Sequence, residues 1–224
     1  MSNVAIVLGA GSGSRMKIDK SKLLLEICGK TVIERSVSAF LDVSDIDEVI
    51  VTVREQDIEA FSEIVTDERV TFVLGGATRQ ESVKAAVETI DECELLIIHD
   101  GARPLIKAED IEKTIRAAKE YGAAATGVRV KDTIKIIDKD FFVESTPDRS
   151  TLFSVQTPQI FNFYLYKQAL KKADNEGRDF TDDCQLLEFA GHKVKMVEGS
   201  YSNIKITTAE DIPLANNILE RETL

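Results

Sequence analysis

The sequence predicts an α/β protein with a single doubly wound, mostly parallel sheet. Apolar runs that suit strands alternate with stretches of helical periodicity as far as residue 128. The runs are apolar on both faces, which is typical of parallel strands buried between two layers of helices. A chain of 224 residues without repeats or linkers suits one domain, residues 1–224.

Each expected strand is a run of five or six residues, and a helical stretch follows each of the first four. The expected strands are Val4–Leu8, Glu48–Val53, Val70–Leu74, Leu95–His99 and Ala123–Val128. The expected helices are Thr31–Phe40, Gln56–Val65, Gln80–Ile90 and Ala108–Tyr121. The last helix starts with two acidic residues and precedes Gly122, features that suit the positive N-terminus and the C-cap of a helix.

The pattern changes at residues 131–150. Two short strands, Thr133–Ile137 and Phe142–Glu144, flank Asp138-Lys139-Asp140, which predicts a β-hairpin. Such an insertion is either an arm that covers a site or a neighbouring subunit, or an ordinary edge hairpin. After it the α/β pattern returns, with a helix near Phe161–Ala173, a helix after Thr181, a strand at Lys193–Val197 and a final helix after Thr207.

Composition excludes several classes of function. Acidic residues outnumber basic ones by 39 to 28, which gives a net charge of −11 and disfavours general nucleic-acid or anionic-membrane binding. With only two histidines and three cysteines, a His- or Cys-based metal cluster is nearly excluded. The cysteines are widely spaced and lack a CxxC motif, which predicts reduced thiols in a cytoplasmic protein. No apolar run is long enough to span a membrane, and no signal peptide is evident.

A glycine-rich loop directly follows the first expected strand. It includes Leu8, Gly9, Ala10, Gly11 and Gly13, whose backbone amides can approach a phosphate closely. The spacing matches neither the dinucleotide-binding fingerprint nor a P-loop. Residues 1–30, which include Arg15 and Lys22, carry a net charge of +3 in this acidic chain. The loop therefore predicts a polyphosphate site, the alternative being a tight turn followed by solvated lysines.

The loop resembles that of nucleotidyltransferases that activate sugar phosphates. The resemblance rests on Gly9-Ala10-Gly11-x-Gly13-x-Arg15-Met16, with Lys22 seven residues after Arg15. Four further segments, at residues 75–82, 99–104, 155–159 and 197–207, are similar to the 2-C-methyl-D-erythritol 4-phosphate cytidylyltransferase family of the non-mevalonate isoprenoid pathway. They include His99-Asp100-Gly101-Ala102-Arg103-Pro104 and Val155-Gln156-Thr157-Pro158-Gln159. The resemblance spans essentially the whole chain.

The resemblance implies a Rossmann-like nucleotidyltransferase fold, with a hairpin arm used for dimerisation. It also implies a reaction in which CTP and methylerythritol phosphate give a CDP-alcohol and pyrophosphate, with Mg²⁺ as the divalent cation. The attacking group is a phosphate oxygen that is already anionic at pH 7. A site of this kind needs positioning and charge neutralisation rather than a general base.

Matching the family's motifs assigns expected roles to individual residues. Arg15 and Lys22 match stabilisers of the transition state. The positions matching nucleotide-binding groups are Leu8, Gly9, Ala10, Gly11, Gly13, Gly76, Arg79, Ser82, Asp100 and Gly101. Those matching groups that hold methylerythritol phosphate are Arg103, Thr133, Arg149, Thr157 and Lys205. Asp100 also matches a residue near the metal, and Arg149 matches an arginine that reaches the partner subunit's site, which implies a homodimer.

Other interpretations remain open at this stage. Taken alone, Ser82 could simply start a helix, Asp100 could cap a loop, and His99 suits a packed core position better than a catalytic one. A ribitol 5-phosphate cytidylyltransferase would share the fold and the base. An NAD(P)-dependent oxidoreductase is disfavoured by the incomplete fingerprint, and a non-catalytic nucleotide-binding module by the retained cations. Ser21, Leu23 and Ala77 stand where relatives often have proline, glutamine and an acid.

Overall fold

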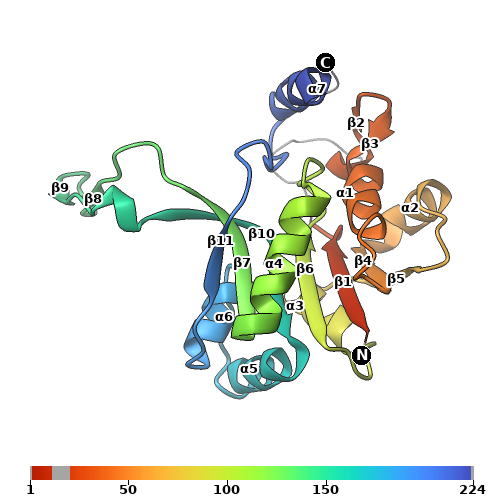
Figure 1. The fold of residues 1–224 in the computed structure, drawn as a ribbon, viewed down its shortest axis with the longest axis horizontal. Coiled ribbons are helices and arrows are strands. Elements are labelled where there is room, and N and C mark those ends of the chain that lie inside the picture. The colour runs from red at the N-terminus through yellow and green to blue at the C-terminus, as the bar shows by residue number, and fades with distance from the viewer. Residues whose placement is uncertain (1, 12–20, 223–224) are drawn as a thin grey trace.

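A seven-stranded sheet forms the centre of the molecule (Figure 1). The computed structural model describes residues 2–11 and 21–222. The strand order is β11 (Lys195–Glu198), β7 (Ala123–Arg129), β10 (Phe153–Asn162), β6 (Leu95–Asp100), β1 (Asn3–Leu8), β4 (Glu48–Val53) and β5 (Val70–Leu74). Only β10 runs antiparallel to its neighbours in this sheet. The doubly wound, mostly parallel sheet is therefore confirmed.

Helices cover both faces of the sheet, because alternate side chains along the central strands point to opposite sides. In β1, Ala5 and Val7 pack into one apolar cluster, whereas Val4 and Ile6 pack into the other. The first cluster involves α1 (Val32–Leu41), α2 (Ile58–Ile64), α4 (Ala108–Tyr121) and α7 (Asp211–Glu222). The second involves α3 (Arg79–Val87), α5 (Phe163–Asn175) and α6 (Asp183–Phe189). Within the described ranges, none of these helices has the length and apolar character of a membrane span.

Short elements complete the fold. A small hairpin of β2 (Glu26–Ile27) and β3 (Lys30–Thr31) lies beside α7 (Figure 1). Single 3-10 turns occur at Lys22–Leu24, Glu55–Asp57 and Arg149–Thr151.

The strand β10 is absent from the sequence-based expectation. Its middle carries polar residues and a proline, and all of Gln156, Thr157 and Gln159 are buried. These side chains hydrogen-bond to distant parts of the chain, so their burial is not visible in the sequence pattern. The following helix begins at Phe163 rather than Phe161.

The final helix begins at Asp211. Its carboxylate accepts the backbone N–H groups of Thr207 and Thr208, at 2.7 and 2.8 Å, and so caps the start of the helix. Pro213 consequently falls in the first turn, where proline is tolerated.

The hairpin at residues 131–150 protrudes from the body of the molecule (Figure 1). Its strands, β8 (Ile136–Ile137) and β9 (Val143–Ser145), are shorter than expected and form a separate two-stranded sheet. The segment is therefore an arm and not an edge hairpin of the main sheet. Its apolar side chains are largely exposed, Phe141 at 83% and Phe142 at 72%.

Candidate active site

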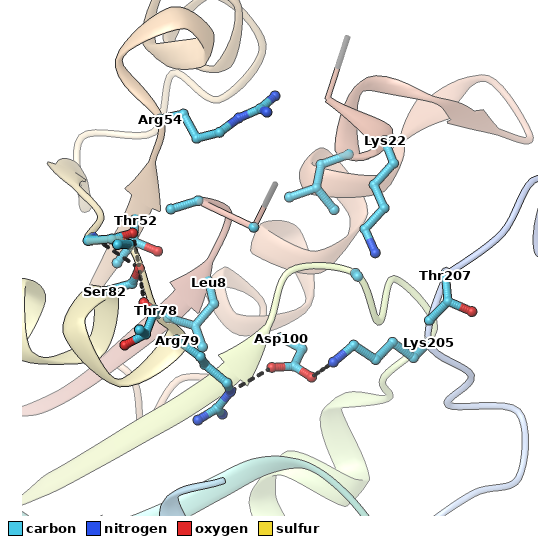
Figure 2. Close-up of a pocket in the computed structure, with 16 residues that line it drawn as sticks. Leu8, Lys22, Thr52, Arg54, Thr78, Arg79, Ser82, Asp100, Lys205 and Thr207 are labelled. Carbon is cyan, nitrogen blue, oxygen red and sulfur yellow. Dashed lines mark hydrogen bonds and ion pairs between the residues drawn. The ribbon is translucent and has the colours of Figure 1, made fainter. Parts of the chain in front are cut away.

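A cavity of about 530 Å³ opens at the carboxyl ends of the central parallel strands (Figure 2). The strand β1 pairs with β4 on one side and with β6 on the other, so the chain's winding direction reverses at β1. Open α/β sheets bind ligands at such a switch point, and this volume is typical of small-molecule sites. The lining residues are Leu8, Ala10, Gly11, Lys22, Leu23, Thr52, Arg54, Gly76, Ala77, Thr78, Arg79, Ser82, Asp100, Ala102, Lys205 and Thr207.

The start of the glycine loop forms one wall of the cavity. The Gly9 N–H donates to the carbonyl of Thr52 at 2.8 Å. A Cβ atom on Gly9 would lie 2.6 Å from that carbonyl oxygen and 2.9 Å from the Phe61 ring, so only glycine allows this approach. A Cβ on Gly11 would meet nothing within 4 Å. Gly13 and Arg15 lie outside the described residues.

The neighbouring wall is the turn between β5 and α3, where a Cβ atom on Gly75 would clash with the Cβ of Ala10. The Ser82 hydroxyl accepts the Gly76 N–H at 3.1 Å and donates to the Thr78 carbonyl at 2.9 Å. Thr78 and Glu81 form a capping box that starts α3. Ser82 thus stabilises the helix start and also lines the cavity, so the two interpretations of this residue are compatible.

Asp100 ends β6 at the floor of the cavity, between two cations (Figure 2). Its Oδ2 lies 2.6 Å from Lys205 Nζ, and its Oδ1 lies 3.4 Å from Arg79 Nε. Burial alone would raise the pKa of Asp100, but the charges of Arg79 and Lys205 outweigh it and hold this pKa well below its usual range. The carboxylate is therefore ionised across the physiological range.

Lys22 enters the cavity from the opposite side (Figure 2). It starts a 3-10 turn that is capped by Ser21, whose hydroxyl accepts the Leu23 N–H. The Lys22 Nζ donates to the Ile206 carbonyl at 2.7 Å. That contact brings the segment after the glycine loop to the segment that carries Lys205.

A buried hydrogen-bond chain supports Asp100 from below. The Asp100 N–H donates to Thr157 Oγ1 at 3.0 Å, and Thr157 Oγ1 lies 3.0 Å from His99 Nδ1. His99 Nε2 lies 3.1 Å from the Arg103 carbonyl, which can only accept, so this nitrogen carries the proton. Nδ1 must then accept from the Thr157 hydroxyl. Burial lowers the pKa of His99 to about 4, which keeps the ring neutral.

Comparison with known proteins identifies the family. A family model described as 2-C-methyl-D-erythritol 4-phosphate cytidylyltransferase (IspD) matches residues 3–221. The chain belongs to this family. It is accordingly a nucleotidyltransferase, of the class that acts in isoprenoid biosynthesis.

Relatives and solved structures agree with this membership. The chain is 43% identical to the cytidylyltransferase of Clostridium novyi, with 97% of this chain and 96% of the relative covered. It is 44% identical to the cytidylyltransferase of Caldanaerobacter subterraneus, with 97% of this chain and 98% of the relative covered. A crystal structure of 4-diphosphocytidyl-2C-methyl-D-erythritol synthase from Anaerococcus prevotii is similar at a TM-score of 0.89 and 38% identity, covering 98% of this chain and 96% of that one. The structure of the Thermus thermophilus cytidylyltransferase is similar at a TM-score of 0.81 and 30% identity, covering 98% of this chain and 100% of that one.

Nine of the residues expected from the IspD resemblance line the cavity. Gly13 and Arg15 are outside the described residues, and the other six lie in three locations. Gly9, Gly101 and Thr157 lie directly behind the lining residues, with the Gly101 N–H donating to the Leu8 carbonyl at 3.0 Å. Arg103 Nη1 donates to the Asn203 carbonyl at 2.8 Å. Thr133 and Arg149 lie on the exposed arm and do not line the cavity. Arg149 Nη1 donates instead to the carbonyl of Lys131 at 2.7 Å.

Several lining residues were not predicted from the sequence. Thr52 and Arg54 stand at the carboxyl end of β4, and Arg54 Nε is 2.5 Å from Asp57 Oδ2. Their position at a strand end adjacent to β1 is the signal that could have revealed them. Thr78 and Thr207 also line the cavity. Both lie in segments that carry the resemblance, but neither was assigned a role.

Proposed function

We propose that this IspD-family enzyme transfers CMP from CTP to 2-C-methyl-D-erythritol 4-phosphate and releases pyrophosphate. The supporting observation is convergence: the glycine loop, Lys22, the Gly76 turn, Asp100 and Lys205 come from distant parts of the chain and meet around one cavity. The substrate's phosphate oxygen attacks the α-phosphorus in line with the departing pyrophosphate. That oxygen is already anionic, so the site needs cations and backbone donors rather than a base.

Lys22 and Arg15 are the proposed stabilisers of charge on the five-coordinate α-phosphate. Lys22 supplies a compact charge inside the cavity, and Arg15 is proposed from its motif alone. Leu8, Ala10, Gly11, Gly76 and Ser82 are proposed to hold the nucleotide. His99 takes no part in proton transfer, because both ring nitrogens are engaged and the ring is buried.

Arg103 and Lys205 are proposed to hold the methylerythritol phosphate. The Arg103 Nε is buried and has no hydrogen-bond partner among the described residues, which is costly unless a ligand supplies one. Lys205 lines the cavity, and its amine points towards the Asp100 carboxylate (Figure 2). Thr157 is proposed to act by orienting Asp100, since its hydroxyl proton is directed to His99.

Mg²⁺ is the proposed cation. No group of three or more His, Cys, Asp or Glu in residues 2–11 and 21–222 could enclose a metal ion. Asp100 can offer one hard oxygen ligand, which fits an ion that keeps its waters and is held chiefly by substrate phosphates. When bound, the ion neutralises charge on the triphosphate.

A homodimer is proposed, with Arg149 acting in the partner's site. The arm exposes Ile136, Ile137, Phe141, Phe142 and Val143, an apolar surface that suits burial against a second copy. Its two substrate-binding candidates, Thr133 and Arg149, do not line the cavity of their own subunit.

We also propose a single domain over residues 1–224 and a cytoplasmic location. One sheet takes strands from residues 3 to 198, which supports the single domain. The three cysteines are free thiols, as in proteins of reducing compartments.

Pyrophosphate release tests the proposed function. The protein is incubated with Mg²⁺, CTP and either methylerythritol phosphate or ribitol 5-phosphate. Release with methylerythritol phosphate is expected. Release with ribitol phosphate alone would change the assigned substrate, and release with neither would favour a non-catalytic nucleotide-binding module.

A further inference from the structure

Asp183 is a buried residue behind the cavity wall, and the proposed function gives its carboxylate no role. It is the first residue of α6, and its side chain is 3% exposed. Its Oδ2 lies 2.5 Å from Arg79 Nη1, and its Oδ1 accepts the Tyr166 hydroxyl at 2.6 Å. Asp183 does not line the cavity, whereas Arg79 does.

Three separate elements fix the position of this carboxylate. Gln159 Oε1 on β10 accepts the backbone N–H groups of Asp183 and Cys184, at 3.0 and 3.2 Å. The Tyr166 hydroxyl approaches from α5, and the Arg79 guanidinium approaches from α3. A carboxylate held from several directions by well-packed groups makes a firm anchor for the flexible arginine side chain.

Arg79 joins this anchor to the active-site carboxylate. Its Nη1 meets Asp183 at 2.5 Å, and its Nε meets Asp100 at the longer distance of 3.4 Å. Together with Lys205, these side chains form a line of alternating charge that ends in the cavity. The shorter contact lies on the buried side, so the guanidinium is held chiefly by Asp183. Without the charge of Asp183, Arg79 would be drawn towards Asp100. Among the described residues, Asp100 is the only other carboxylate that forms an ion pair with Arg79.

We propose that Asp183 is a positioning residue for nucleotide binding, because it holds Arg79 back from Asp100 and leaves Oδ1 of Asp100 available to the nucleotide. This inference rests on the proposed function for the identity of the nucleotide. It predicts that the Asp183 charge acts through Arg79 and through no other route.

A double-mutant cycle tests this prediction. The full-length variants Asp183→Asn, Arg79→Met and the double variant are compared with wild type for kcat and for KM towards each substrate. Asp183→Asn is expected to raise the KM for CTP by about tenfold, within the range of couplings between contacting residues. The KM for methylerythritol phosphate should change less. In the Arg79→Met background, Asp183→Asn should add less than about twofold.

The matched control is Asp174→Asn. Asp174 pairs with Lys84 at 2.7 Å and so also links α3 to α5, but on the surface and away from the cavity. This variant should leave the KM for CTP unchanged. If the effects of Asp183→Asn and Arg79→Met simply multiply, or if Asp174→Asn raises KM equally, the positioning role is overturned.

Two further variants keep the test decisive if Asp183→Asn fails to fold, since removing one partner of a buried ion pair is destabilising. Asp183→Glu and Tyr166→Phe both retain a carboxylate facing Arg79, and both should stay within about threefold of the wild-type KM for CTP while the melting temperature falls. A tenfold rise in both would show a merely structural role. Wild-type protein that releases no pyrophosphate would instead overturn the proposed function, and the same cycle would then be measured as CTP affinity by calorimetry.

Discussion

The Nζ atom of Lys205 lies 2.6 Å from Oδ2 of Asp100, although 105 positions separate the two residues in the chain. Arg79 faces the other oxygen of the same carboxylate. A carboxylate that is buried at the floor of a cavity would be costly alone, and these two cations offset that cost. Substrate binding must therefore take place in a site that is already ion-paired.

Acid denaturation should reveal this arrangement. The pKa of Asp100 is lowered in the folded protein, because the two cations outweigh the effect of burial. Its stabilising contribution is thus present above the unfolded-state pKa of about 4, and it is lost as the pH falls below that value. Melting temperatures of wild type and Asp100→Asn are measured by circular dichroism from pH 7 to pH 3. The difference between the two proteins should be smaller at pH 3 than at pH 7. Parallel curves would contradict the prediction.

His99 should make the stability of the folded protein depend on pH in a higher pH range than Asp100 does. Burial lowers its folded-state pKa to about 4, whereas the unfolded-state pKa is about 6.5. The unfolded chain therefore binds the proton first, and stability falls as the pH drops from about 6.5 towards 4. Between pH 7 and pH 5 the loss attributable to His99 is about 2 kcal/mol.

Urea denaturation at pH 7 and pH 5 measures that loss. His99→Gln cannot take up the proton, so its free energy of unfolding should change less between the two values than that of wild type. An equal change in both proteins would show that His99 is not the group responsible.

Most of the sheet could be predicted from the sequence because its strands carry local, continuous apolar patterns. The strand Glu48–Val53 and the helix Ala108–Tyr121 were placed with the bounds that the structure shows. The strand β10 was missed because Gln156 and Thr157 are buried through contacts with Asn203, His99 and Asp100, which are distant in sequence.

The residues that line the cavity could be predicted where they belong to a sequence motif, but not where only the packing of distant elements brings them there. Lys22, Asp100 and Lys205 were expected because each belongs to a motif, and all three line the cavity. Arg54 carries no motif and becomes a lining residue only because β4 pairs with β1. Asp183 contacts Arg79 across 104 positions, a relationship that no local pattern encodes.

Two alanine substitutions in the glycine loop should differ in their effects on stability. Gly9→Ala places a Cβ against the Thr52 carbonyl and the Phe61 ring, and overpacking of this kind costs about 1–3 kcal/mol. The melting temperature should fall by about 5 °C. Gly11→Ala meets open space and should stay within about 1 °C of wild type. Differential scanning calorimetry of the two variants compares them directly, and equal melting temperatures would be inconsistent with the steric argument.

The arm should control oligomeric state. Phe142 is 72% exposed on the arm, where the proposed dimer would cover it. Phe142→Asp would bury a charge in that interface and should shift the protein to monomers in sedimentation velocity. Its melting temperature is the control for folding of the subunit. Wild-type protein that sediments as a monomer at micromolar concentration would refute the dimer.

Subunit mixing tests whether Arg149 works in the partner's site. Lys22→Ala and Arg149→Ala should each lower turnover, Lys22→Ala by about 10²–10³-fold if Lys22 stabilises the transition state. In a mixed dimer, one site would combine an intact Lys22 with an intact Arg149 from the partner subunit. Equal mixing gives mixed dimers in half of the population, so about a quarter of wild-type activity should return.

The reverse mixture supplies the control for this experiment. Wild type is mixed with the double variant Lys22→Ala/Arg149→Ala, and exchange is verified with an affinity tag on one partner. If Arg149 acts across the interface, each mixed dimer has no working site, because the wild-type subunit receives an alanine from its partner. Activity per wild-type subunit should then fall by about half in an equal mixture. Unchanged activity, together with no recovery in the first mixture, would place Arg149 in the site of its own subunit.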